Sequence, residues 1–125
     1  MTVCLVVDDS TTQRKLMKKI AESCGVDVTE AKNGLDALKQ CEENVPDIII
    51  LDINMPGMSG LEFLNSLREM PKEYSPYIIV CSANINTDDI VAAVKAGADA
   101  YHCKSTDIDN LRSKIKEAFE KSGAR

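Results

Sequence analysis

Residues 3–24, VCLVVDDSTTQRKLMKKIAESC, contain the pattern that decides the fold. The stretch begins with an apolar run, as in a buried strand, and this run ends at Asp8 and Asp9. Apolar residues then recur at helical spacing from Leu16 to Cys24, which is typical of a helix that buries one face. The stretch therefore predicts a strand that passes through a short acidic turn into an amphipathic helix.

The same alternation of strand-like and helical patterns continues along the chain. Further apolar runs occupy residues 47–51, 77–81 and 100–103, and most runs are almost continuously apolar, as strands covered on both faces are. Residues 26–30 alternate between apolar and polar and predict an edge strand. Since a helical pattern follows each strand, we predict a doubly wound α/β domain with a parallel sheet of five strands and with five helices on its two faces.

Each predicted helix has an apolar face, and most have recognisable ends. The residues assigned to the buried faces are Leu16, Met17, Ile20 and Cys24; Leu35, Leu38 and Cys41; Leu61, Leu64 and Leu67; Ile90, Val91 and Val94; and Ile108, Leu111, Ile115 and Phe119. Helix starts are predicted by Ser10-x-x-Gln13 and Ser59-x-x-Glu62, which fit a capping box, and by Asn33 and Thr106 as N-caps. Helix ends are predicted at Gly25 and Gly97, because glycine takes the left-handed C-cap geometry without strain.

The composition narrows the class of protein. The 125 residues suffice for one domain, and we assign residues 1–125 to it. A net charge of −5 disfavours nucleic acid as a partner, since a basic surface is needed to neutralise phosphates. The five cysteines include no C-x-x-C pair, so we expect free thiols and a cytoplasmic location. No apolar stretch approaches the ~20 residues of a membrane span, and a signal peptide is not apparent.

Residues that can bind a metal ion or take part in a reaction follow the apolar runs. They are Asp8 and Asp9 after the first strand, Asp52 after the third, Ser82 after the fourth and Lys104 after the fifth. In a parallel sheet these ends share one edge, which is where ligands bind in open α/β sheets. Three crowded carboxylates repel one another, and a bound divalent cation would neutralise much of their negative charge. Because oxygen ligands with room for water suit Mg²⁺, the sequence predicts a magnesium site that also receives an anionic group.

Four motifs at these strand ends resemble one known family. They are VVDDS at residues 6–10, LDINMPGMSG at 51–60, CSA at 81–83 and AYHCK at 100–104. In this order and spacing they are similar to the bacterial response-regulator receiver domains of the single-domain, CheY-like kind, over essentially the whole chain. The resemblance implies a flavodoxin-like sheet with the strand order 2-1-3-4-5.

The resemblance also assigns a role to each site residue. By it Asp52 is the phosphoacceptor, a carboxylate nucleophile that forms an acyl phosphate. The implied ligands of Mg²⁺ are Asp8, Asp9, Asp52 and the backbone carbonyl of Asn54. The groups implied to bind the phosphoryl oxygens are the Lys104 ammonium, the Ser82 hydroxyl and the Ala83 N–H.

A switch and a set of partners follow from the same resemblance. Phosphorylation is expected to draw Ser82 inward and Tyr101 into the vacated space, whereas His102 is expected to pack in the fifth strand. A histidine kinase is the implied phosphodonor. A motor switch or a phosphotransferase is expected to bind the face formed by the fourth helix, fifth strand and fifth helix. The implied protein is a monomer and no enzyme, beyond promoting its own phosphorylation and dephosphorylation.

Three alternative functions are each disfavoured by a feature of the sequence. A pseudo-receiver would use it for docking alone, although the expected site residues are all present. A flavodoxin-type FMN carrier would need a phosphate loop where Asp8 and Asp9 stand, and an aspartyl phosphatase would need a D-x-D pair there. One departure from the family is Ser105, which stands where a proline usually follows Lys104; a cis bond before Ser105 would cost about 3–4 kcal/mol.

Overall fold

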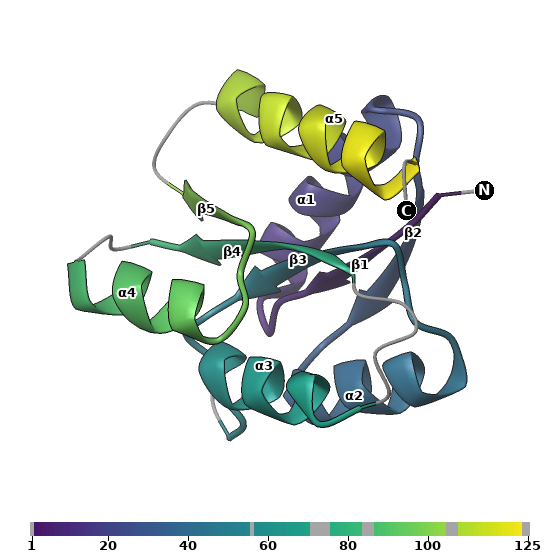
Figure 1. Cartoon of the computed structure of the whole chain (residues 1–125). Coiled ribbons are helices and arrows are strands. Elements are labelled where there is room, and N and C mark those ends of the chain that lie inside the picture. The colour runs from purple at the N-terminus through teal and green to yellow at the C-terminus, as the bar shows by residue number, and fades with distance from the viewer. Residues whose placement is uncertain (1, 56, 71–75, 84–86, 105–107, 124–125) are drawn as a thin grey trace.

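The computed structural model describes five strands, each followed by a helix (Figure 1). The described residues are 2–55, 57–70, 76–83, 87–104 and 108–123. In chain order the elements are β1 (Val3–Val7), α1 (Thr11–Ser23), β2 (Asp27–Ala31), α2 (Gly34–Glu43), β3 (Ile48–Asp52), α3 (Gly60–Arg68), β4 (Tyr77–Ser82), α4 (Thr87–Lys95), β5 (Ala100–Cys103) and α5 (Ile108–Gly123). The predicted alternation of strands and helices is confirmed.

The strands form one parallel sheet in the order β2-β1-β3-β4-β5. This is the order that the family resemblance implies. As its alternating pattern predicts, β2 lies at an edge, whereas every residue of β3 and β4 is buried. Because the strands are parallel, their carboxyl ends all open on the same edge of the sheet.

Two apolar cores hold the sheet between its helices. On one face α1 and α5 cover Val6, Ile50 and Ile79, and Figure 1 shows these two helices together on that side. On the other face α2, α3 and α4 cover Leu51 and Val80. Alternate residues of each strand thus serve opposite cores, which is why the central strands are apolar at nearly every position.

The helix starts agree with the sequence except at one capping box. Ser59 and Glu62 form both bonds of the predicted box at the start of α3. At α1 the Ser10 side chain accepts a hydrogen bond from the Gln13 N–H at 3.3 Å. The predicted reciprocal bond is wrong, because the Ser10 N–H donates instead to Asp8 Oδ1 at 2.9 Å. The first cap of the fold is therefore tied directly to an acidic residue of the site.

The remaining helix ends follow the predicted chemistry. Asn33 caps α2 by accepting a hydrogen bond from the Asp36 N–H at 2.8 Å. Gly25 and Gly97, just after α1 and α4, have φ values of 90° and 105°, which other residues rarely adopt. The predicted cap Thr106 lies outside the described residues.

Six apolar side chains that were assigned to buried helix faces are exposed. They are Leu16, Leu35, Val91, Val94, Ile108 and Phe119. In α4 the buried residue is Ala93, whereas Val91 and Val94 are exposed. The prediction was wrong at these positions because helical spacing locates an apolar stripe but not which part of a broad stripe is covered.

The structure also tests two expectations from the composition, free thiols and the absence of a membrane span. All five cysteines are free thiols, as predicted, and burial raises the pKa of Cys41 to about 11. Within the described part of the chain, no helix combines the length and the apolar character needed to cross a bilayer.

Candidate functional site

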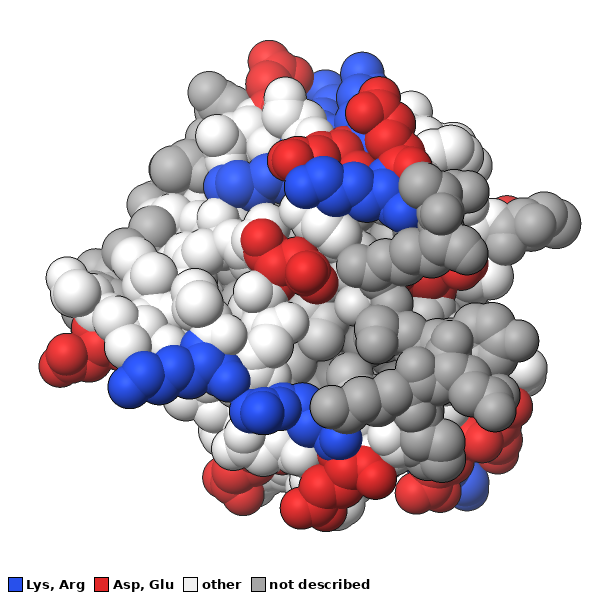
Figure 2. Space-filling view, in the orientation of Figure 1, with Lys and Arg blue, Asp and Glu red and all other residues white. Residues whose placement is uncertain are grey.

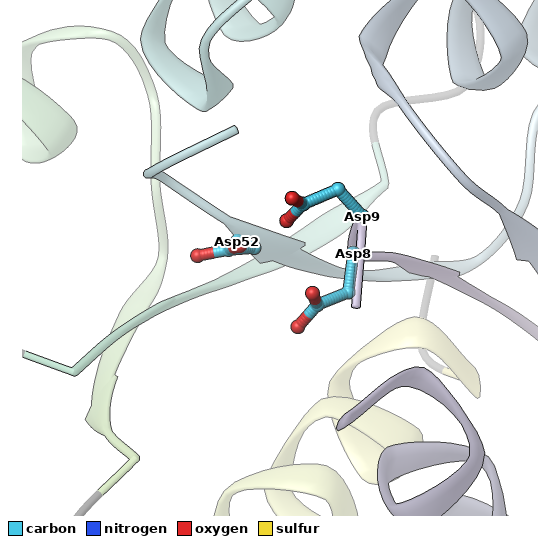
Figure 3. A group of neighbouring side chains, drawn as sticks. All are labelled: Asp8, Asp9 and Asp52. Atoms are coloured by element: carbon cyan, nitrogen blue, oxygen red, sulfur yellow. The ribbon is translucent and has the colours of Figure 1, made fainter. Parts of the chain in front are cut away.

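The residues expected at the strand ends meet at one edge of the sheet. They are Asp8 and Asp9 after β1, Asp52 and Ser82 as the last residues of β3 and β4, and Lys104 after β5. Figure 3 shows the carboxylates of Asp8 and Asp9 extending from the end of β1 toward the side on which Asp52 lies. Parallel strands thus bring Lys104 against Asp8, although 96 positions separate them in the sequence.

Asp8, Asp9 and Asp52 form what we term the acidic cluster. One carboxylate oxygen of each lies within 4.8 Å of those of the others. Asp8 and Asp52 are buried, whereas Asp9 is exposed. Mg²⁺ uses a few carboxylate oxygens and keeps several water molecules, so a cluster with one side open to water fits this ion.

The Lys104 ammonium bridges two carboxylates of the acidic cluster. Its Nζ lies 2.9 Å from Asp8 Oδ2 and 3.3 Å from Asp52 Oδ1. Burial alone would lower the pKa of Lys104, but the two carboxylates outweigh that effect and raise the pKa. Lys104 therefore stays charged at neutral pH. Its bond to Ser105 lies outside the described residues.

Asp52 is buried and only partly compensated by neighbouring positive groups. Burial raises the pKa of Asp52 to about 6, and the charge of Asp8 adds to the rise, while Lys104 and the Asn54 N–H oppose it. The Asn54 N–H donates to Asp52 Oδ1 at 3.2 Å. A carboxylate that is ionised near neutral pH and poorly hydrated is suited to act as a nucleophile.

Asn54 also links the acidic cluster to the end of β4. Its Nδ2 donates to Ser82 Oγ at 3.3 Å, a side-chain role that the sequence did not indicate. Ser82 is fully buried, and its carbonyl accepts a hydrogen bond from the Lys104 N–H at 2.9 Å. Ala83 follows as an exposed residue. Asn54 therefore connects Asp52 to the Ser82 hydroxyl through two hydrogen bonds.

Gly60 is a further site residue whose role was missed. A Cβ at this position would lie 2.5 Å from the backbone oxygen of Asp52 and 2.7 Å from the Cα of Ile53. The Gly60 N–H donates to the Ile53 carbonyl at 2.9 Å, so the start of α3 packs directly on the backbone that carries Asp52. Although Gly60 is part of a quoted motif, this close approach depends on the three-dimensional path of the loop.

Residues 4–116 match the family model described as "Response regulator receiver domain". This range contains the acidic cluster, Ser82 and Lys104. The chain belongs to this family. The resemblance identified from the four motifs is thereby confirmed.

Two similar proteins differ in how much of their own length the receiver covers. The chemotaxis protein CheY of Listeria monocytogenes is 39% identical over 123 residues, which cover 98% of each chain. The nitrate/nitrite response regulator protein NarL of Escherichia coli (strain K12) is 39% identical over 117 residues, which cover 91% of the receiver and 53% of NarL. The receiver thus spans about half the length of the NarL proteins that it matches.

Solved structures share the fold of the receiver over nearly all of its length. A CheY-like response regulator receiver domain protein from Methanospirillum hungatei superposes with a TM-score of 0.88 at 27% identity, covering 99% of this chain and 98% of that one. The Vibrio cholerae chemotaxis protein CheY4 gives a TM-score of 0.87 at 25% identity, covering 94% and 98%. The predicted CheY-like fold is confirmed.

Two ring residues of β5 occupy different environments in the receiver. Tyr101 is half-buried and packs against the core that α2, α3 and α4 cover. Its hydroxyl is buried and has no hydrogen-bond partner among the residues that the structure describes. Burial raises the pKa of Tyr101. His102 is buried with its Nδ1 3.2 Å from Asn110 Oδ1, as expected of a packing residue.

Proposed function

We propose that this receiver accepts a phosphoryl group on Asp52, with Mg²⁺ bound beside it. The observation that carries the proposal is the convergence of three carboxylates within 4.8 Å of one another beside the Lys104 ammonium. Crowded carboxylates that are partly buried destabilise a fold, so a purely structural role does not account for them. Their position at the carboxyl edge of an open α/β sheet is where ligand sites form.

In the proposed step an oxygen of Asp52 attacks the phosphorus atom of the donor. The new O–P bond forms while the bond from phosphorus to the leaving group breaks, and that electron pair departs with the leaving group. The broken bond is P–N for a phosphohistidine and P–O for acetyl phosphate, and the product is an acyl phosphate. The Lys104 ammonium, the Ser82 hydroxyl and the Ala83 N–H are proposed to bind the phosphoryl oxygens.

The proposed ligands of Mg²⁺ are Asp8, Asp9, Asp52 and the backbone carbonyl of Asn54. When bound, the ion supplies positive charge to the phosphoryl oxygens. Lys104 contacts both Asp8 and Asp52, so its ammonium can exchange an oxygen of Asp52 for one of the phosphoryl group while it keeps Asp8. The site residues thus contribute mainly by holding charges in place, as phosphoryl transfer requires.

The proposed output is protein binding on the α4–β5–α5 face. Among the described residues of its helices, the exposed large apolar ones are Val91 and Val94 of α4 and Ile108 and Phe119 of α5. Figure 2 shows a largely uncharged area over α4 and β5, with an acidic patch beside it and Lys and Arg side chains above and below it. Phosphorylation is proposed to draw Ser82 inward and Tyr101 into the vacated space, and this movement is the proposed signal to the α4–β5–α5 face.

The proposed partners are a histidine kinase as phosphodonor and a motor switch or phosphotransferase as target. Two relatives of equal identity are named as a chemotaxis protein and as a nitrate/nitrite response regulator, and both names support a role in response regulation. We further propose a cytoplasmic monomer that catalyses its own phosphorylation and dephosphorylation alone. Its net charge of −5 argues against nucleic acid as a partner of this chain.

Intact-mass measurement after incubation with Mg²⁺ and acetyl phosphate tests the proposal. We expect one phosphoryl adduct, which is lost in Asp52→Asn and in the presence of EDTA. Asp27→Asn is the matched control, since it removes an exposed carboxylate from the start of β2 and should leave the adduct intact. No adduct under conditions that label another receiver would favour the docking-only alternative.

A further inference from the structure

Arg14, in the first turn of α1, contacts the main chain of the acidic cluster. Its Nη1 donates to the carbonyl oxygen of Asp8 at 2.9 Å, and its Nε donates to Glu30 Oε1 at 3.1 Å. The side chain is 14% exposed, so one largely buried guanidinium joins the end of β1 to β2. A cation in the first turn opposes the helix dipole, so helix stability does not explain this residue.

The hydrogen bond from Arg14 to the Asp8 carbonyl constrains the main chain from which the Asp8 and Asp9 side chains extend. The Asp8 N–H donates to the Ala31 carbonyl at 3.2 Å, so the main chain of Asp8 is held on both sides. The carbonyl of Asp8 and the N–H of Asp9 belong to one planar peptide unit. A hydrogen bond that fixes this carbonyl therefore also fixes the plane from which Asp9 extends. Because Asp9 is exposed, its main chain does more than packing to set its direction.

Glu30 holds Arg14 in the orientation that reaches Asp8. The Glu30 carboxylate also lies 2.8 Å from Lys15 Nζ and 3.7 Å from Lys18 Nζ. The hydrogen bond from Lys15, assisted by the Arg14 and Lys18 cations, lowers the pKa of Glu30, so this carboxylate is ionised at neutral pH. Lys15 offers a natural comparison, since it contacts Glu30 as Arg14 does but is exposed and is not the donor to Asp8.

We propose that Arg14, anchored by Glu30, is a positioning residue that sets the Mg²⁺ affinity of the acidic cluster without contacting the ion. The inference rests on the proposed function, because it requires the Mg²⁺ site. Two effects of Arg14 have opposite signs. Its positive charge competes electrostatically with a bound cation, whereas its hydrogen bond orients the ligands. Removing Arg14 weakens Mg²⁺ binding if orientation prevails and strengthens it if charge alone counts.

A Mg²⁺ titration of the full chain, followed by NMR through the backbone amides of Asp9 and Asn54, measures the sign directly. The proteins compared are the wild type, Arg14→Gln, Arg14→Lys and the matched control Lys15→Gln. We expect the Kd for Mg²⁺ to rise about tenfold in both Arg14 variants, as for residues that orient metal ligands elsewhere. The Kd of Lys15→Gln should stay at the wild-type value or fall slightly, because this variant loses charge but keeps the contact to Asp8.

Three results would overturn the inference. The first is an Arg14→Gln protein whose Kd equals or falls below that of the wild type, and the second is an equal rise in Lys15→Gln. The third is a wild type without saturable Mg²⁺ binding, which would overturn the proposed metal site as well; normal wild-type binding with unaltered variants would leave that site standing. Thermal melting in EDTA checks folding, and Arg14→Lys or Glu30→Gln carries the same test if Arg14→Gln does not fold.

Discussion

Burial has opposite effects on stability in the middle of the sheet and at its carboxyl edge. In the middle of the sheet Ile50 and Ile79 are buried among apolar side chains, and their burial stabilises the fold. At the carboxyl end Asp8 and Asp52 are nearly as well buried, but they carry groups whose charges are poorly hydrated and repel each other. Two apolar cores therefore hold the strands firmly enough to keep like charges together at one edge of the sheet.

The largest expected effect comes from breaking the apolar middle. Ile50→Ala should lower the free energy of unfolding by about 2–5 kcal/mol, because the cavity between α1, α5 and the sheet cannot fully collapse. Urea unfolding of the metal-free protein measures this loss. A loss below about 1 kcal/mol would show that the middle of the strands is less tightly packed than its burial suggests.

An effect of nearly the same size and opposite sign is expected at the charged end. Asp52→Asn should raise the free energy of unfolding in EDTA by up to about 3 kcal/mol above pH ~7, because the pKa of Asp52 is about 6 in the folded protein instead of 3.8. The native protein binds this proton more tightly than the unfolded chain does. Wild-type stability therefore falls as pH rises from about 4 to 6, and that loss is absent in the variant.

Urea unfolding of the wild type and Asp52→Asn at pH values near 4 and near 7.5 checks this prediction. The difference between them should shrink toward zero at the lower pH, because Asp52 is then mostly protonated in the native protein and its charge no longer destabilises it. The exposed control Asp27→Asn should change stability by no more than about 0.5 kcal/mol at either pH. An Asp52→Asn protein that is less stable than the wild type near pH 7.5 would contradict the view that this charge is a cost to the fold.

The smallest effect is expected where an apolar residue lies outside both cores. Val94 of α4 is 63% exposed, so Val94→Ser should change the free energy of unfolding by no more than about 0.5 kcal/mol and leave the acetyl phosphate adduct in place. Thermal melting and intact mass measure the two quantities. A loss above about 1 kcal/mol would mean that Val94 supports the core as Ile50 does.

Much of the fold was predictable because the burial of a strand determines which of its successive residues are apolar. Residues covered on both faces must be apolar at successive positions, as in β3, whereas β2 alternates because it lies at the edge. The candidate site was predictable for a related reason. Parallel strands place their carboxyl ends on one edge, so Asp52 and Lys104 could be assigned to the same place from their positions after apolar runs.

The contacts within the site were less predictable, because they join residues that are distant in the sequence. The link from Asn54 to Ser82 depends on the pairing of β3 with β4, and the link from Arg14 to Glu30 depends on α1 lying against β2. Nothing in the local pattern of Arg14 distinguishes it from the lysines that follow it. Its side chain is special because of what the register of β1 and β2 places beside it.

The sequence alone predicts the order of strands and helices along the chain, the edge position of β2 and the identity of the polar residues at the strand ends. It could do so because backbone periodicity and strand burial act on neighbouring residues. Tertiary structure alone decided that Val91 and Val94 face outward, that Gly60 packs on the backbone of Asp52, and that Lys104 bridges two carboxylates. These features arise where separate elements meet, so their geometry exists once the sheet and its helices have packed together.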